Sequence, residues 1–265
     1  NKTTRLLHNV SGLWLIQECR RYWIEQGEEI SFAELARLAE EAEPFTAFID
    51  PNDSTFVSPG DMPSKIQAFC EKTEQRKPHS KGAVLRVATE SLALKYRQIV
   101  ESLEKVTGRT FDVLNAGGGG VQNEFLVQAT ADAIGINVVT GPIEATSCGN
   151  IITQMVATGD LHDITACRTL IASSMETKTY SLKSSGHWQY PFKRFQYLTK
   201  HQYTHEDCIQ QRQYAQDWYS PYHRWSSRRR PRVSRGPDHE PGEGYGGIHL
   251  RETLLPRWFT CRVCY

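Results

Sequence analysis

The chain has 265 residues, of which 39% are hydrophobic and 23% are charged, and its formal net charge at pH 7 is +1. This balance excludes the strong positive field of a dedicated nucleic-acid or membrane-surface binder. No run of about 18 apolar residues is present, and the first ten residues lack the apolar centre of a signal peptide, so we expect no membrane contact. The seven cysteines are widely spread, which favours free thiols in a reducing compartment and predicts a cytoplasmic protein.

Capping signals predict two helices in the first 80 residues. Ser31 and Glu34 have the spacing of a capping box, so a helix is expected from residue 32 to about residue 42. Asp61 followed by Pro63 indicates another helix start, and this helix should end near residue 72.

Helices and strands alternate in the sequence after residue 80. Apolar residues recur at steps of three or four between residues 85 and 106, which predicts a long helix that ends at Gly108. The following elements are a strand at 111–114, a helix at 121–134, a strand at 136–140 and a helix at 144–158. This alternation is typical of an α/β fold.

The composition changes near residue 200. Residues 1–200 contain 10 Arg and 11 Lys, whereas residues 201–265 contain 10 Arg and no Lys. The second segment shows no helical or strand period and is broken by Pro and Gly, so it has little apolar area to offset chain entropy. We therefore predict a folded domain at 1–200 and an irregular or disordered tail at 201–265. A frame-shifted reading frame is one explanation for this tail.

Two functional alternatives exist for the tail. Its arginines, with Trp218, Tyr222 and Trp225, suggest binding of nucleic acid through phosphates and stacking, but interspersed acidic residues dilute the patch and argue against it. Cys261 and Cys264 form a C-x-x-C pair, yet a structural zinc site usually has two such pairs. No metal-binding residue is assigned.

Four glycines, Gly117 to Gly120, stand between a predicted strand and a predicted helix. Glycine lets a ligand approach the main chain closely, and the first N–H groups of a helix favour a phosphate. A Walker loop is excluded because Val121, Gln122 and Asn123 stand where G-K-[ST] is required, and Gln122 also breaks the dinucleotide fingerprint. The loop alone is equally compatible with a tight turn that binds nothing.

Five sequence blocks follow one another in the order 9–23, 50–66, 91–97, 118–126 and 141–150, with the glycine loop continuing into GGGVQNEFL. Together they resemble the rhamnulokinases of the FGGY family of carbohydrate kinases. The resemblance covers residues 1 to about 200 and fades after residue 180. It implies the C-terminal, nucleotide-binding domain of an actin-like or ribonuclease-H-like ATPase fold.

The resemblance also implies a set of binding residues. Asn9 matches a position that contacts the sugar, and Gln17 matches one that contacts ATP. These two residues would lie roughly 12 Å apart along the axis if the segment were helical throughout. In the glycine loop, Gly119 matches a nucleotide-contacting glycine, flanked by Gly118 and Gly120. Asn123 is either an adenine neighbour or a helix N-cap, and Gly149 is expected at a close helix contact.

The family's aspartate base, its first phosphate loop and most sugar contacts lie upstream of the matched region. No catalytic residue is therefore assigned. Four aspartates are interpreted as structural, namely Asp50, Asp53, Asp112 and Asp132.

The complete enzyme would use ATP and Mg²⁺ to phosphorylate L-rhamnulose, and this chain would need the missing N-terminal kinase domain as its partner. Alternatives are a fuculokinase or xylulokinase of the same family, or a non-catalytic nucleotide-binding module with an Arg-rich tail.

Overall fold

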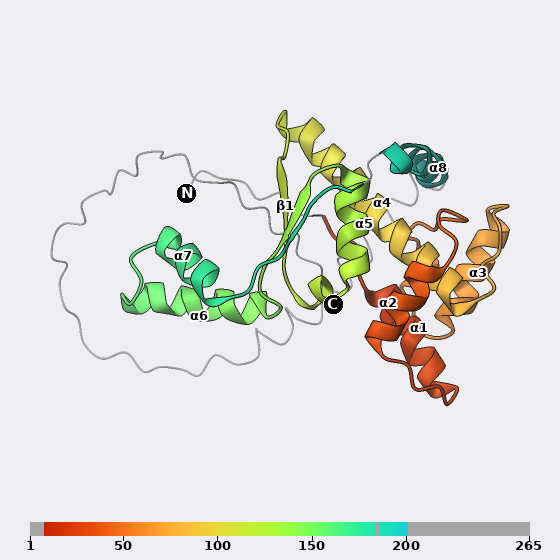
Figure 1. The fold of residues 1–265 in the computed structure, drawn as a ribbon, viewed down its shortest axis with the longest axis horizontal. Helices are drawn as coiled ribbons and strands as arrows, with labels where there is room; N and C mark the ends of the chain where they lie inside the picture. Colours follow the sequence, from red (N-terminus) through yellow and green to blue (C-terminus); the bar gives the residue numbers. More distant parts are fainter. Residues whose placement is uncertain (1–7, 184–185, 201–265) are drawn as a thin grey trace, which may run out of the picture. The chain divides into compact units, whose positions relative to one another are not determined.

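The computed structural model describes residues 8–183 and 186–200 (Figure 1). The helices of this part are α1 (Trp14–Glu25), α2 (Phe32–Glu41), α3 (Met62–Lys72), α4 (Lys81–Thr107), α5 (Glu124–Ile134), α6 (Ala145–Thr158), α7 (Ile164–Ser174) and α8 (Gln189–Lys200). The strands are β1 (Val113–Ala116), β2 (Asn137–Thr140) and β3 (Thr179–Tyr180), and the 3-10 turns are η1 (Ser54–Phe56), η2 (Gly119–Gln122) and η3 (Gly186–Trp188). The tail predicted at 201–265, with its arginines and its cysteine pair, lies outside the described residues.

The sheet has the order β1-β2-β3. β1 and β2 are parallel, with Val113 opposite Asn137 and Ala116 opposite Thr140, whereas β3 runs antiparallel to β2. α5 connects the two parallel strands and packs on the sheet through Val127 and Ala131. The predicted β-α-β unit is therefore present, and it positions the glycine loop at the carboxyl end of β1.

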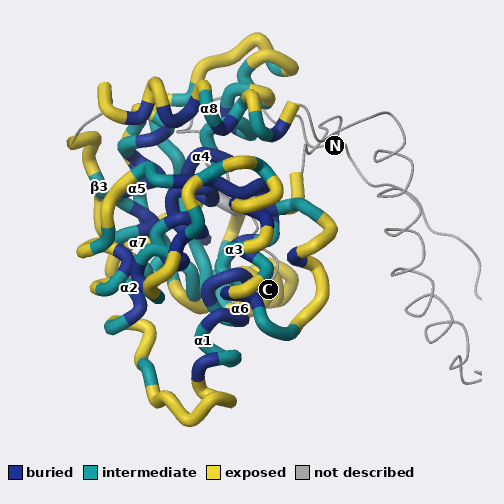
Figure 2. Tube along the Cα trace, turned by 90° about the vertical axis from the view of Figure 1, so that its right-hand side faces the viewer, coloured by how far each residue is buried: buried dark blue, intermediate teal, exposed yellow. Residues whose placement is uncertain are grey.

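α4 is the helix on which the other helices pack. Thirteen of its 27 residues are buried, so it needs neighbours on several sides (Figure 2). α1, α2 and α3 contact it in one apolar cluster, which includes Leu15, Ile66 and Leu92. α5 and α8 contact it in a second cluster, which includes Ala129 and Phe195. α4 thus connects the segment that carries α1 to the β-α-β unit.

The predicted helix caps are confirmed. Ser31 Oγ accepts a hydrogen bond from the Glu34 amide at 3.1 Å, and Asp61 Oδ1 accepts one from the Ser64 amide at 3.0 Å. Gly108 ends α4 with a φ of 63°, a left-handed conformation that glycine adopts without strain. Local side-chain and backbone chemistry therefore determines these helix ends.

Two predicted boundaries are wrong, and the start of α4 was not predicted. α4 begins at Lys81, because Ser80 Oγ accepts a hydrogen bond from the Ala83 amide and caps the helix. β1 begins two residues later than predicted, since the amide of Phe111 donates to Glu104 of α4 instead of to the sheet. α5 begins at Glu124, three residues after the predicted start, because η2 occupies the residues before it.

Among the described residues, no helix combines the length and the apolar character needed to cross a bilayer.

Candidate nucleotide site

The glycine loop follows β1 at the carboxyl edge of the parallel strand pair. The amide of Gly141 donates to the carbonyl of Ala116 at 2.7 Å, so the segments that follow β1 and β2 stay together beyond the last paired residues. In open α/β sheets, ligands bind outside the carboxyl ends of parallel strands. The loop is therefore at the edge of the sheet where a ligand is expected.

The glycines of the loop serve different structural purposes. A Cβ on Gly117 would approach Ala145 Cβ to 3.2 Å, so this position is glycine because the start of α6 packs against it. Gly118 has a φ of 91°, which side-chain-bearing residues rarely adopt, and its amide donates to Pro142 at 3.0 Å. Neither Gly119 nor Gly120 has a positive φ. Their backbone conformation therefore does not require glycine.

Gly119 and Gly120 open the 3-10 turn η2. The amide of Val121 donates to the carbonyl of Gly118 at 3.2 Å and makes the first hydrogen bond of the turn. The two N–H groups before it have no acceptor inside the turn, because its hydrogen bonds reach back three residues. Both glycines are half-buried. These two adjacent amides can donate to an anionic oxygen, and no Cβ would hinder the approach of that oxygen.

Asn123 is the N-cap of α5. Its Oδ1 accepts a hydrogen bond from the Leu126 amide at 3.0 Å, and its own amide donates to Gly120 at 3.2 Å. The capping alternative considered in the sequence is therefore present. The side-chain oxygen keeps one lone pair beside this bond, and the side-chain nitrogen has two donors, so the cap leaves Asn123 able to contact a nucleotide.

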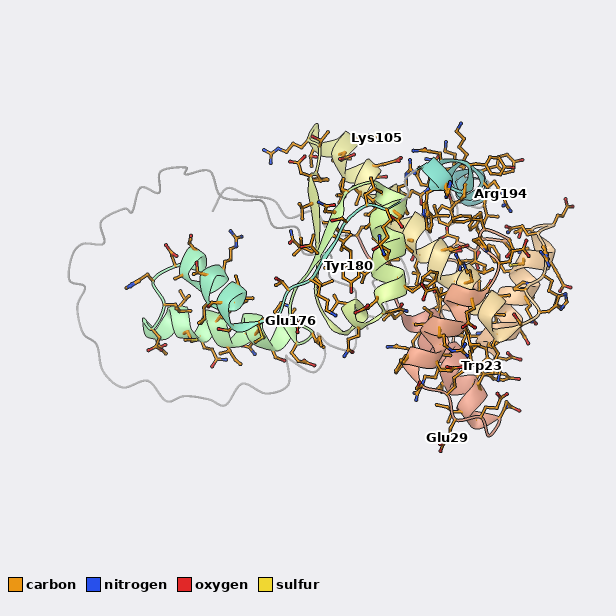
Figure 3. All side chains as sticks on the ribbon, viewed as in Figure 1. Trp23, Glu29, Lys105, Glu176, Tyr180 and Arg194 are labelled. Carbon is orange, nitrogen blue, oxygen red and sulfur yellow. The ribbon has the colours of Figure 1, made fainter. Side chains whose placement is uncertain are left out.

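An exposed ion pair stands at the first turn of α5. Lys178 Nζ lies 2.9 Å from Glu124 Oε1, and this hydrogen bond lowers the pKa of Glu124 and raises the pKa of Lys178. Tyr180 of β3, labelled in Figure 3, packs against the cluster that joins α5 to the sheet. Lys178 offsets a negative charge that would otherwise repel a phosphate at the start of the helix.

The backbone around Asn9 is held by Asn52. Asn52 Oδ1 accepts a hydrogen bond from the Ser11 amide at 3.2 Å, and its Nδ2 donates to the Asn9 carbonyl at 3.3 Å. Asn52 is in turn held by Asp50, whose Oδ1 accepts a hydrogen bond from the Asn52 amide at 3.0 Å. The Asn9 residue itself is exposed. The sugar-side residue expected from the sequence is thus exposed on an anchored segment.

Gln17 lies half-buried on α1. The helix begins only at Trp14, so residues 9–17 are not helical throughout, and the separation expected between Asn9 and Gln17 on that condition does not apply. The cause is a turn at Gly12 and Leu13, which ends in the N-cap of α1. Val10 and Leu15 belong to the same apolar cluster as Leu126 of α5. The elements that carry Asn9, Gln17 and Asn123 therefore share one core.

Three of the four aspartates considered in the sequence make structural hydrogen bonds. Asp50 is buried, with its Oδ1 3.1 Å from Lys95 Nζ. Asp53 caps η1 by accepting from the Thr55 amide at 2.8 Å, and Asp132 accepts from the Lys183 amide at 2.7 Å. Asp112 is exposed just before β1. These roles agree with the structural interpretation.

The expected close helix contact at Gly149 is wrong for the described residues. A Cβ on Gly149 would meet no atom within 4 Å, because no described element covers this side of α6. Within the same residues, no group of three or more His, Cys, Asp and Glu side chains is placed to hold a metal ion.

Sequence reasoning missed three contributors to the site: Asn52, Pro142 and Lys178. Asn52 holds the backbone 41 and 43 residues before it, and Lys178 pairs with Glu124 54 residues before it. No local period or cap signals such contacts. The one local signal is the proline after Gly141, because a residue before proline favours an extended backbone, here in the segment near the glycine loop.

Comparison with known proteins gives the family of the chain. Residues 1–158 match the FGGY family of carbohydrate kinases, C-terminal domain. Rhamnulokinase from Bacteroides thetaiotaomicron is 40% identical over 193 residues, which are 73% of this chain and 39% of that protein. Rhamnulokinase from Enterococcus faecalis is 44% identical over 180 residues, which are 67% of this chain and 36% of that protein. The chain spans about two fifths of the length of these relatives.

Solved structures show the same fold at low sequence identity. Gluconate kinase from Lactobacillus acidophilus superposes with a TM-score of 0.51 at 16% identity, over 72% of this chain and 38% of that chain. Xylulose kinase from Rhodospirillum rubrum superposes with a TM-score of 0.50 at 16% identity, over 70% and 36%. The predicted actin-like α/β fold is confirmed, and so is the resemblance read from the sequence blocks. The chain therefore belongs to the FGGY family of carbohydrate kinases, and residues 1–158 correspond to the family's C-terminal domain.

Proposed function

We propose that this chain is the ATP-binding half of a rhamnulokinase-type sugar kinase. The complete enzyme transfers the γ-phosphoryl group of ATP to L-rhamnulose and yields ADP and L-rhamnulose 1-phosphate. The observation that carries the proposal is the pair of open amides at Gly119 and Gly120, next to the N-terminus of α5. Asn123 and Gln17 complete the nucleotide side, and Gly118 gives the loop its shape.

The geometry of the loop fits a phosphate. Two adjacent N–H donors at a turn that leads into a helix bind an anion through hydrogen bonds and the positive end of the helix dipole. The ion pair between Lys178 and Glu124 keeps the first turn of α5 from presenting an uncompensated negative charge.

The chain alone is proposed to be inactive. Phosphoryl transfer needs a base for the sugar hydroxyl, Mg²⁺ on the phosphates and close positioning of both substrates. The buried or capping aspartates Asp50, Asp53 and Asp132 are held in structural bonds, so none of them is assigned as the base. Mg²⁺ usually binds through substrate phosphates, waters and one or two carboxylates, so we expect it to enter with ATP.

Asn9 is proposed to contact the sugar. Its segment is anchored by Asn52, so its exposed side chain would be presented in a defined position once the rest of the enzyme closes over it. The choice of L-rhamnulose rests on the names of the relatives. The cytoplasmic location inferred from the sequence stays a prediction.

Two measurements on the purified full chain test the proposal together. Calorimetric titration with ADP should show saturable, weak binding, because only half of the phosphate environment is present. A coupled assay with ATP, Mg²⁺ and L-rhamnulose should show no ADP production above the no-protein control. Absence of saturable binding would refute the nucleotide role, and sugar-dependent turnover by the unaided chain would refute its dependence on a partner.

A further inference from the structure

Residues 50–53 form a tight turn beside the segment that carries Asn9. The amide of Asp53 donates to the carbonyl of Asp50 at 3.0 Å, and the amide of Asn52 donates to Asp50 Oδ1 at 3.0 Å. Pro51 stands at the second position of the turn, where its fixed φ is favourable. The side chain of Asp50 therefore bonds to its own turn and determines where Asn52 lies.

The carboxylate of Asp50 also attaches this turn to α4. Its Oδ1 and Oδ2 lie 3.1 Å and 3.4 Å from Nζ of Lys95, which is in the middle of the helix. Both side chains are buried. A buried ion pair is weak evidence for stability, because each charge loses its hydration and apolar residues of similar size often serve as well. The consequence that this pair does have is positional, since it connects the turn to the helix on which the domain packs.

Asn52 holds two successive peptide units. Its Nδ2 donates to the carbonyl of Asn9 at 3.3 Å, and its Oδ1 accepts from the amide of Ser11 at 3.2 Å. These groups belong to the peptide units on either side of Val10, whose side chain is buried in the core that α1 shares with α4. One orientation of the side-chain amide satisfies both bonds, because its oxygen only accepts and its nitrogen only donates. Asn52 thus fixes the main chain from which the Asn9 side chain extends.

Gly12 is the reason that this segment needs to be held. It has a φ of 52° and lies between Ser11 and the N-cap of α1, so the chain turns there at its most permissive type of residue. α1 by itself therefore does not determine where the residues before it lie. On the other side of Gly12, the indole N–H of Trp14 donates to the carbonyl of Phe56 at 2.9 Å. The start of α1, the helix that carries Gln17, is thus held by a bond that does not involve Asn52.

We propose that Asn52 is a positioning residue for the sugar side of the site and that Asp50 holds it in place. Asn52 binds the main chain of Asn9, so the exposed side-chain amide of Asn9 can be offered to a ligand. That amide has donors and an acceptor, which suits the hydroxyl groups of a sugar. Fixing the backbone in advance reduces the ordering cost of such a contact. The inference rests on the proposed function, which assigns the sugar contact to Asn9.

NMR relaxation of the ¹⁵N-labelled full chain tests the positioning role. In the unmodified chain, the amides of Val10 and Ser11 should have order parameters of about 0.85, as in a rigid backbone, and Asn52→Ala should lower both below about 0.6. Asn52→Asp keeps the acceptor for Ser11 but removes the donor to Asn9, so only the Val10 amide should become mobile. Asp53→Ala is the matched control, because it removes the cap of η1 in the same loop and should leave both amides ordered.

Two double variants test the part assigned to Asp50. Asp50→Asn with Lys95→Met removes both buried charges but keeps the oxygen that accepts from the Asn52 amide, so Val10 and Ser11 should stay ordered. Asp50→Leu with Lys95→Met removes the charges and the acceptor, and both amides should become mobile. Equal order in the two double variants would overturn the role of Asp50.

Titrations with sugar and with ADP distinguish this inference from the proposed function. L-Rhamnulose should shift the side-chain amide signals of Asn9 in the unmodified chain, and at the same concentration the shift should be at least about twofold smaller in Asn52→Ala. The affinity for ADP should be the same in both proteins. If Val10 and Ser11 stay ordered in Asn52→Ala, or if this variant also loses ADP affinity, the positioning role is refuted and the nucleotide role stands. If the unmodified chain is ordered but shows no shift at Asn9, the sugar contact of the proposed function fails, and Asn52 is then a structural residue only.

Discussion

The amide of Gly118 donates a hydrogen bond to the carbonyl of Pro142 at 3.0 Å, which ties the glycine loop to the segment before α6. The bond orients the loop so that Gly118 provides the turn, whereas Gly119 and Gly120 keep their amides open. The two kinds of glycine should respond differently to mutation.

Gly118→Ala should destabilise the protein, because a side chain would be strained at a φ of 91°. A cost of about 1–3 kcal/mol in the free energy of unfolding is expected. Gly119→Ala should leave this free energy nearly unchanged, since Gly119 has no positive φ, but it should weaken ADP binding. Urea unfolding and calorimetry measure the two quantities. Equal loss of stability in both variants would show that the loop has a purely structural role.

Two substitutions at Asn123 separate its role as the cap of α5 from a role in nucleotide binding. Asn123→Ala should lower the free energy of unfolding by about 1 kcal/mol, because the Leu126 amide loses its acceptor. Asn123→Asp keeps the acceptor and removes the Nδ2 donor, so stability should be retained while ADP affinity falls. If Asn123→Asp binds ADP as well as the unmodified chain, an adenine contact through Nδ2 of Asn123 is excluded.

The ion pair between Lys95 and Asp50 is buried, with 7% and 1% of the two side chains exposed. Lys95→Met should lower the free energy of unfolding by about 3–5 kcal/mol, because Asp50 loses its Lys95 partner inside the protein. The double variant with Asp50→Asn should recover part of this loss. Lys178→Met, at an exposed pair, should change stability by less than about 1 kcal/mol. A similar loss in both lysine variants would contradict the burial of the first pair.

The lowered pKa of Glu18 predicts part of the pH dependence of the free energy of unfolding. The hydrogen bond from Arg21 lowers the pKa of Glu18 below its ordinary value of 4.5, and the Gly60 amide contributes in the same direction. A carboxyl whose folded-state pKa is lowered stabilises the protein above its unfolded-state pKa, and this contribution is lost as the pH falls below 4.5. The stability difference between the unmodified chain and Glu18→Gln should therefore shrink on acidification. Glu25→Gln, on the exposed partner of the same Arg21, should show a smaller difference at every pH.

Local chemistry explains what the sequence could predict. Ser31, Asp61 and Gly108 determine their helix ends by bonds to the nearest residues or by their own conformation, and these ends were predicted correctly. β3 was not predicted because its two residues form a strand only by pairing with β2. α8 was not predicted because its face is defined by contacts with α4 and with distant residues such as Phe45, whose carbonyl accepts a hydrogen bond from Arg194.

The features of the candidate site also fall into two groups, those that adjacent residues determine and those that depend on tertiary contacts. The glycine loop and the capping alternative for Asn123 follow from residue types that are adjacent in the chain. The anchoring of Asn9 by Asn52 and the neutralisation of Glu124 by Lys178 depend on tertiary contacts. The separation given for Asn9 and Gln17 assumed a continuous helix, and a resemblance of sequence blocks does not indicate that the helix begins only at Trp14.

The central claim is that the Gly119 and Gly120 amides bind the phosphates of a nucleotide. Amide-resolved NMR of the ¹⁵N-labelled full chain during titration with ADP tests it most directly. The claim predicts the largest shift changes at Gly119 and Gly120, while the helix-ending glycines Gly135 and Gly108 stay unchanged. Saturable binding that shifts other amides and leaves Gly119 and Gly120 in place would contradict it.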